Sequence, residues 1–278
     1  MAEGDVEKKW LFDRPWTRNF TKVRQDFISK FVGGARKQIE LVSALDVGCG
    51  VGYFSKLLLE MGFQVVAVDG RQENANEGKR RYPEITFLTK NVEDPALAEM
   101  GTFDLVLSVG LLYHLENPFR AIRNLHVLTG KILLIETMCV PNEQPTMHLL
   151  DEGIAEDQGL NYVAFYPSES CLVKMLYRAG FPFVYRFERL PADELYTAGA
   201  WRKRLRTYLA ASKTALTLDN LVLTKDLLQP VSGPSDPWAT LLSRLQGQLF
   251  QLRVFLSRLV KPRRGKADSA PSGDVGAK

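Results

Sequence analysis

A glycine-rich turn between a short apolar run and a helical pattern is the feature that most restricts the fold of this chain. The glycines are Gly48, Gly50 and Gly52; they follow the apolar run 44–47 and precede a predicted helix over 53–61. Glycine lacks a Cβ atom, so the backbone can turn tightly there and approach a ligand. The helix that follows presents free N–H groups and the positive end of its dipole. The turn therefore predicts a site for a ligand with a carboxylate or phosphate.

Apolar runs and helical patterns alternate along most of the chain. Helices are expected over 20–32, 53–61, 73–81, 118–128 and 167–179. Strands are expected over 44–47, 64–68, 85–88, 105–108, 131–136, 183–187 and 206–211. This alternation favours a parallel sheet with helices on both faces. We predict an α/β fold: a Rossmann-like, doubly wound, mostly parallel seven-stranded sheet, followed by a C-terminal amphipathic helix.

The second predicted strand ends in an acidic residue, Asp69, which is followed by Gly70. Asp69 lies 21 residues after Gly48, which fits one strand–helix–strand step. A carboxylate at this strand end can accept hydrogen bonds from both hydroxyls of a ribose. A dinucleotide site is the alternative, but its fingerprint needs a third glycine where this chain has Tyr53. The sequence also offers no clear second half for a nicotinamide.

Four further motifs follow the glycine turn and Asp69. They are NVED over 91–94, FDLVLS over 103–108, YHL and NP within 113–118, and RTYLAASK over 206–213. In this order, residues 40–215 resemble the class I S-adenosylmethionine-dependent methyltransferases, although the family more often has Asp where this chain has Asn91. The resemblance implies S-adenosyl-L-methionine as cofactor and no metal. The implied cofactor contacts are Asp46, Gly48, Gly50, Gly52, Asp69, Gly70, Asn91, Val92 and Ser108.

A narrower likeness involves Tyr113 and His114, then Glu136 and Thr137, then residues 166–168 before a helix. This run is similar to the tRNA wobble-uridine carboxymethyltransferases, and sugar and glycolipid O-methyltransferases share much of it. We expect O-methylation of a small-molecule, sugar or glycolipid acceptor. A tRNA-modifying alkyl transferase and a non-catalytic scaffold with a methyltransferase fold are the alternatives.

Two titratable side chains are expected at the ligand edge of the sheet. His114 comes just after the fourth predicted strand, and Glu136 ends the fifth. A hydroxyl acceptor must lose its proton during methyl transfer, so His114 is the candidate general base. Glu136 could orient the acceptor hydroxyl or a tyrosine. The alternatives are a histidine that only hydrogen-bonds backbone near the cleft and a glutamate that simply ends a strand.

Charge is unevenly distributed along the chain. Residues 201–278 contain 14 Lys and Arg against 5 Asp and Glu, whereas residues 1–200 contain 22 against 27. A net negative region is poorly suited to a polyanion, so nucleic acid is the less expected partner. Three sparse cysteines, no apolar leader and no apolar run of membrane-spanning length together favour a cytoplasmic protein.

Apolar residues recur at alternating steps of four and three residues near the C-terminus, a pattern typical of a heptad seam. They are Trp238, Leu242, Leu245, Leu249, Leu252, Leu256 and Leu259. Such a helix could pack on its own domain, pair with a partner such as a second copy, or lie on an anionic membrane surface through residues 238–266.

The expected organisation has five parts. Residues 1–40 form a helical lead-in or lid, and 41–228 form the S-adenosylmethionine-binding domain. A linker over 229–237, rich in Pro, Ser and Gly, leads to a leucine-rich helix over 238–261. Residues 262–278 are basic and low in apolar residues, which predicts a disordered tail.

Overall fold

The computed structural model describes residues 10, 13–140, 144–152, 159–197, 206–225 and 245–252. The chain divides into two compact units, Met1–Pro234 and Ser235–Lys278, and each is described by itself. The predicted linker 229–237 and tail 262–278 lie outside the described residues.

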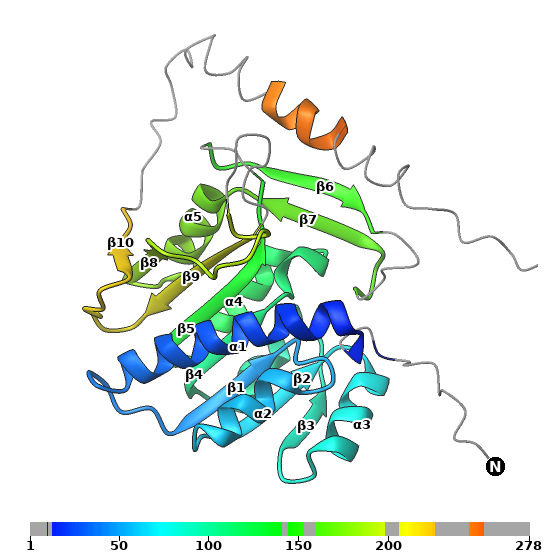
Figure 1. Ribbon diagram of the computed structural model, residues 1–278, viewed down its shortest axis with the longest axis vertical. Coiled ribbons are helices and arrows are strands. Elements are labelled where there is room, and N and C mark those ends of the chain that lie inside the picture. The colour runs from blue at the N-terminus through cyan, green and yellow to red at the C-terminus, as the bar shows by residue number, and fades with distance from the viewer. Residues whose placement is uncertain are drawn as a thin grey trace, which may run out of the picture. The chain divides into compact units, whose positions relative to one another are not determined.

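The first unit is built on an eight-stranded sheet (Figure 1). Its strands are β1 Ser43–Val47, β2 Gln64–Asp69, β3 Thr86–Thr89, β4 Phe103–Val109, β5 Thr129–Met138, β8 Phe183–Phe187, β9 Arg206–Ser212 and β10 Leu221–Leu223. The order across the sheet is β10-β8-β9-β5-β4-β1-β2-β3. Neighbours from β3 to β5 pair in parallel, whereas β9 is antiparallel to both β5 and β8.

The sheet reverses its direction of growth beside β1. The chain passes from β1 outward to β2 and β3, then returns to place β4 on the opposite side of β1. Crossover connections diverge at such a point, and they leave a crevice at the carboxyl ends of the strands. The topology therefore positions a ligand site after β1 and β4.

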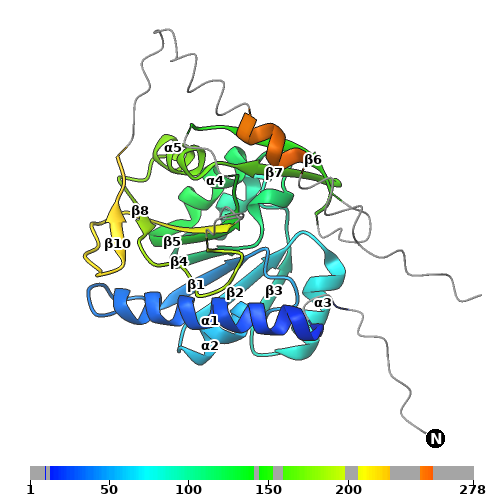
Figure 2. The same ribbon diagram turned by 45° about the horizontal axis from the view of Figure 1, so that its top comes forward.

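Helices cover both faces of the sheet (Figure 2). They are α1 Pro15–Ala35, α2 Tyr53–Glu60, α3 Gln72–Arg81, α4 Pro118–Leu128 and α5 Glu169–Ala179. The helices α1 and α2 pack on one face and α4 and α5 on the other. Local residues explain several ends: Pro118 begins α4, Ser168 accepts a hydrogen bond from the Cys171 N–H, and Gly180 closes α5 with a φ of 113°.

The predicted α/β class is confirmed, and the sheet has one strand more than the seven expected. The additional strand, β10, has only three residues, too few for a recognisable alternation. A separate hairpin, β6 Met147–Asp151 and β7 Val163–Pro167, was also not expected. Its β7 strand packs on the 3-10 turn Leu112–His114, so the hairpin contributes to the crevice after β4.

In the second unit, residues 245–252 are helical, within the predicted 238–261. Leu245, Leu249 and Leu252 of the expected seam are 45%, 65% and 52% exposed. Among the residues that the structure describes, no helix combines the length and apolarity that crossing a membrane requires.

Candidate functional site

A cavity of about 410 Å³ opens after β1, β2 and β4, where the strand order reverses. This volume is in the usual range for small-molecule sites. The glycine turn and the segments after β2 and β3 form one part of its wall, here called the β1–β3 part. The segment after β4, the first residue of β9 and the start of α1 form the other, the β4–β9 part.

The glycine turn depends on a backbone that only glycine adopts without strain. Gly48, Gly50 and Gly52 have φ of 73°, 54° and 92°. A Cβ on Gly48 would lie 2.9 Å from Leu111, and one on Gly52 would lie 2.7 Å from the Phe87 ring. Gly48 and Gly50 line the cavity, whereas Gly52 is the N-cap of α2 behind the wall.

Asp69 joins the end of β2 to the glycine turn. Its Oδ2 accepts a hydrogen bond from the Gly50 N–H at 2.8 Å. Its Oδ1 accepts from the Arg71 N–H at 2.9 Å and from the Asn74 amide at 3.0 Å. Burial raises the pKa of this carboxyl above its usual value despite these donors. Asp69 also lines the cavity, where hydroxyl groups of a ligand could reach it.

Three other predicted cofactor contacts, Gly70, Asn91 and Val92, also line the β1–β3 part. The Asn91 Oδ1 accepts a hydrogen bond from the Glu93 N–H at 2.9 Å, which fixes the loop after β3. Leu160 lies against Gly70, since a Cβ there would come within 2.9 Å of its Cδ1.

Besides Gly52, two residues predicted to contact the cofactor do not line the cavity. Asp46 is 1% exposed, and its Oδ2 accepts a hydrogen bond from Ser55 Oγ at 2.6 Å. Burial raises its pKa to about 7, and the charge of Asp69 adds to the rise. Ser108 is completely buried within β4. Asp46 and Ser108 therefore lie in the packing beneath the wall and not on its surface.

Five side chains form a hydrogen-bonded group beside the β4–β9 part, here called the arginine cluster: Arg24, Tyr113, Glu136, Tyr196 and Arg206. Arg206 Nη1 donates to both Glu136 oxygens at 3.0 and 3.2 Å, and its Nη2 donates to the Tyr113 hydroxyl at 3.0 Å. Arg24 and the Tyr196 hydroxyl also donate to Glu136, at 3.3 and 2.8 Å. Arg24, Tyr113 and Arg206 line the cavity.

The arginine cluster carries an excess of positive charge, because two guanidinium groups share one carboxylate. Burial would raise the pKa of Glu136, but Arg206 and Arg24 outweigh burial and lower it. Burial would likewise raise the pKa of Tyr113, but the arginine charge lowers it to about 8. Glu136 is fully buried and does not line the cavity. Its partners are the two arginines and the Tyr196 hydroxyl, so of the two expected roles the structure has the contact with a tyrosine.

His114 lies in the turn after β4 and lines the cavity. Its Nδ1 is in ion-pair contact with Glu152, which follows β6 and also accepts a hydrogen bond from the Gly159 N–H at 3.2 Å. Burial would lower the pKa of His114, but Tyr113 and Glu152 outweigh burial and raise it. The buried Nε2 has no hydrogen-bond partner among the described residues, so this nitrogen could exchange a proton with a ligand.

Sequence reasoning did not single out Arg24, Arg206 or Glu152. A signal existed for the arginines: Arg24 falls on the apolar side of a helix, and Arg206 begins a buried strand. Charged residues in such places are almost always paired in the interior. Glu152 follows Asp151 in a locally acidic stretch, and nothing in that context marks it.

Two segments outside the sheet cover the cavity. The first contributes Trp10 and the start of α1, and the second contributes residues 159–161 from the connection between β6 and β7. The second segment is held by Arg71 Nη2, which donates to the Gly159 carbonyl at 2.6 Å. The described residues contain no group of His, Cys, Asp and Glu side chains that could hold a metal ion.

Comparisons with known proteins agree on one class of enzyme. A family model described as a methyltransferase domain matches residues 45–130. The chain is 31% identical over 184 residues to a tRNA U34 carboxymethyltransferase of Pseudoalteromonas atlantica, covering 63% of this chain and 51% of that protein. It is 32% identical over 105 residues to a ubiquinone biosynthesis O-methyltransferase of Xanthomonas oryzae pv. oryzae, covering 36% and 42%. The chain thus spans about half the length of these relatives, or less.

Solved structures share the fold. The N-terminal domain of EvdMO1, crystallised with S-adenosylhomocysteine bound, superimposes with a TM-score of 0.54 at 18% identity, covering 69% of this chain and 80% of that one. An S-adenosylmethionine-dependent methyltransferase of Clostridium acetobutylicum has a TM-score of 0.50 at 11% identity, covering 69% and 91%.

Proposed function

We propose that this class I S-adenosylmethionine-dependent methyltransferase methylates a hydroxyl of a small-molecule, sugar or lipid-linked acceptor that also carries an anionic group. The observation that carries the proposal is the arginine cluster, in which Arg24 and Arg206 share the carboxylate of Glu136 beside the cavity. Excess positive charge in a partly dry wall favours a carboxylate or phosphate. The relatives named for ubiquinone O-methylation support a hydroxyl as the atom that is methylated.

The β1–β3 part of the cavity suits the cofactor. Gly48 and Gly50 provide a wall without side chains, and Asp69 provides a carboxylate for the ribose hydroxyls. Gly70, Asn91 and Val92 would border the adenosine, as the family resemblance implies. When bound, the cofactor supplies a methyl group on a positively charged sulfonium, so departure of the methyl relieves a charge.

His114 is the proposed general base. When a hydroxyl acceptor is methylated, Nε2 of His114 would take up the hydroxyl proton. Glu152, in contact with Nδ1, would orient the ring and stabilise its protonated form. Arg24 and Arg206 would hold the anionic group so that the hydroxyl faces the methyl.

Replacing Asp69 with alanine should weaken binding of S-adenosylhomocysteine by about 1–3 kcal/mol, the scale of lost hydrogen bonds to a charged group. The change also removes the acceptor that ties the Gly50 N–H to β2. Isothermal titration calorimetry measures the effect. Asp104→Ala is the control, because Asp104 accepts hydrogen bonds from the N–H groups of Val42 and Ser43 at the start of β1 and does not line the cavity. Unchanged affinity in Asp69→Ala, or heat with NAD alone, would contradict the assignment.

The acceptor class is tested with radiolabelled methyl donor and pools of sugars, phenols, glycolipids and tRNA. We expect transfer to hydroxyl compounds that carry a carboxylate or phosphate, and poor transfer to their neutral esters. Arg206→Gln should reduce the difference in transfer between the acids and their neutral esters, because it removes the positive charge of a residue that lines the cavity. Equal transfer to acids and esters would refute the anionic acceptor, and cofactor binding without turnover on any pool would favour the scaffold alternative.

Transfer of an alkyl group to tRNA is the second candidate. Several relatives are named tRNA U34 carboxymethyltransferase. The arginine cluster could hold the carboxylate of a carboxymethyl group as readily as it could hold the carboxylate of an acceptor molecule. The net negative charge of residues 1–200 argues against a surface for a polyanion. Tight tRNA binding with a steep salt dependence, retained after removal of residues 230–278, would favour this candidate over the first.

We further propose that residues 238–266 attach the enzyme to a partner helix or to an anionic membrane surface. The exposed leucines at 245, 249 and 252 support an apolar contact, and Arg263, Arg264 and Lys266 follow in the sequence. A chain ending at residue 229 should keep its affinity for S-adenosylhomocysteine while losing self-association or binding to acidic liposomes. Aggregation with loss of cofactor binding would instead assign the helix to the catalytic domain.

A further inference from the structure

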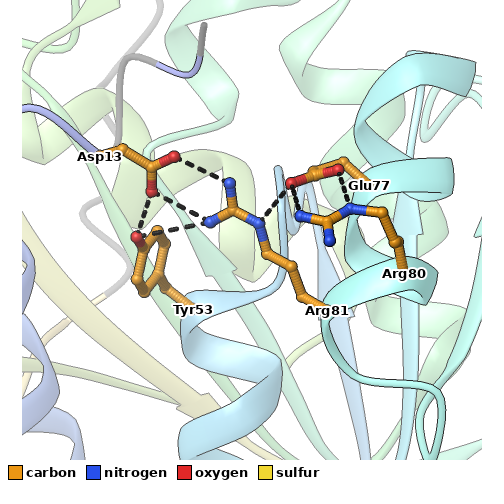
Figure 3. A network of polar contacts seen from close by, with 5 residues as sticks. All are labelled: Asp13, Tyr53, Glu77, Arg80 and Arg81. Atoms are coloured by element: carbon orange, nitrogen blue, oxygen red, sulfur yellow. Dashed lines mark hydrogen bonds and ion pairs between the residues drawn. The ribbon is translucent and has the colours of Figure 1, made fainter. Parts of the chain in front are cut away.

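A network of charged side chains ties the N-terminal segment to two other elements (Figure 3). Asp13 lies just before α1, and Arg81 ends α3. Arg81 Nη1 donates to Asp13 Oδ1 at 3.0 Å, and Nη2 donates to Oδ2 at 2.8 Å. The hydroxyl of Tyr53, the first residue of α2, donates to Oδ1 at 2.5 Å. We call Asp13, Tyr53 and Arg81 the latch.

The latch is supported from one side by Glu77. Arg81 Nε donates to Glu77 Oε1 at 2.8 Å, which holds the guanidinium with its other edge toward Asp13 (Figure 3). Hydrogen bonding from Arg81 lowers the pKa of Asp13, and hydrogen bonds from Arg80 and Arg81 lower that of Glu77 to about 2. These groups are therefore charged at neutral pH. The Asp13 and Arg81 side chains are 15% and 16% exposed, so water screens their pair only in part.

The segment that the latch holds forms part of the cofactor cavity. Trp10, Thr17, Phe20 and Thr21 line the cavity, and so does Tyr53, directly after the glycine turn. These N-terminal residues belong to no strand of the sheet. Further along α1, Arg24 donates a hydrogen bond to Glu136, and buried side chains pack on the sheet: Ile28, Phe31, Val32 and Ala35.

From these contacts we infer that the latch holds the segment from Asp13 to Thr21 as a lid across the cofactor cavity. The cofactor enters and its demethylated product leaves when Asp13 separates from Arg81 and Tyr53. Tyr53 belongs both to the latch and to the cavity wall, so a bound cofactor and a closed lid meet at the same side chain. This inference concerns retention of the cofactor and does not depend on which acceptor is methylated.

Arg81→Ala should accelerate dissociation of S-adenosylhomocysteine about tenfold, because the lid loses charge-assisted hydrogen bonds that must otherwise break before the ligand leaves. The rate is measured as release of labelled S-adenosylhomocysteine from the full chain after dilution into unlabelled ligand. Arg80→Ala is the matched control. Arg80 is the preceding residue of the same helix and is 72% exposed. Among the described residues its hydrogen bonds go to Glu77 and not to Asp13.

A second variant keeps the inference testable if Arg81→Ala fails to fold. Asp13→Asn changes only the lid side of the latch and should accelerate dissociation in the same direction. The double variant should release the ligand no faster than the faster single variant, because both substitutions break one contact. Unchanged dissociation in Asp13→Asn, additive effects in the double variant, or an equally fast Arg80→Ala would each overturn the latch, while leaving the affinity test at Asp69 unaffected.

Discussion

Glu136→Gln should lower the free energy of unfolding by about 3–5 kcal/mol, the scale measured when one partner of a buried ion pair is removed. The substitution leaves Arg24 and Arg206, which are 6% and 8% exposed, without their shared carboxylate. The loss is read from the urea midpoint. Glu60→Gln serves as the control, because the Glu60 side chain is 61% exposed and pairs with Lys56 one turn earlier in α2.

The pH dependence of this loss has a definite sign. The arginines lower the pKa of Glu136 in the folded chain. The Glu136 carboxylate therefore contributes its full stabilisation when the pH is above its pKa in the unfolded chain, near 4.5. This stabilisation declines as the pH falls through the lower pKa of the folded chain. The stability gap between wild type and Glu136→Gln should narrow on acidification. A gap that is small at neutral pH, or that widens in acid, would contradict the arrangement of charges in the cluster.

His114→Gln should lower kcat by about 10²–10⁴-fold, the usual contribution of a general base, while S-adenosylhomocysteine still binds. A general base acts in its unprotonated form, so wild-type activity should increase with pH as His114 loses its proton. Because the pKa of His114 is raised in the folded chain, activity should level off at a pH above the usual histidine pKa. Glu152→Gln removes a contact that raises this pKa, and it should move the rise to lower pH. His148→Gln is the control, since His148 lies on β6 and does not line the cavity.

A different proton acceptor would leave a distinct pattern. The pKa of Tyr113 is about 8, and its ring centroid lies 3.9 Å from that of His114. A rise in activity near pH 8 that persists in His114→Gln and disappears in Tyr113→Phe would assign the proton to Tyr113. Unchanged kcat in both variants would remove the general base from the proposal.

The sequence by itself determined the fold class and the β1–β3 part of the cavity, because both depend on local patterns. Gly48, Gly50 and Gly52 have positive φ angles, and this local backbone conformation favours glycine whatever packs against it. Asp69 follows from the length of one strand–helix–strand step. The hairpin of β6 and β7 and the short β10 could not be recognised, because half-exposed strands of three to five residues carry too little alternation.

Only the tertiary structure decided which charged side chains meet. Glu136 and Arg206 lie 70 residues apart, and Glu136 and Arg24 lie 112 apart. The first pair meets because antiparallel β5 and β9 pair Met138 with Arg206, and the second because α1 crosses the same end of the sheet. Asp13 and Arg81 form a third pair of this kind, because they lie 68 residues apart in the sequence and meet only in the folded chain. A sequence pattern records the period of each element but not its register or packing against another, so these contacts, and the roles proposed from them, required the fold.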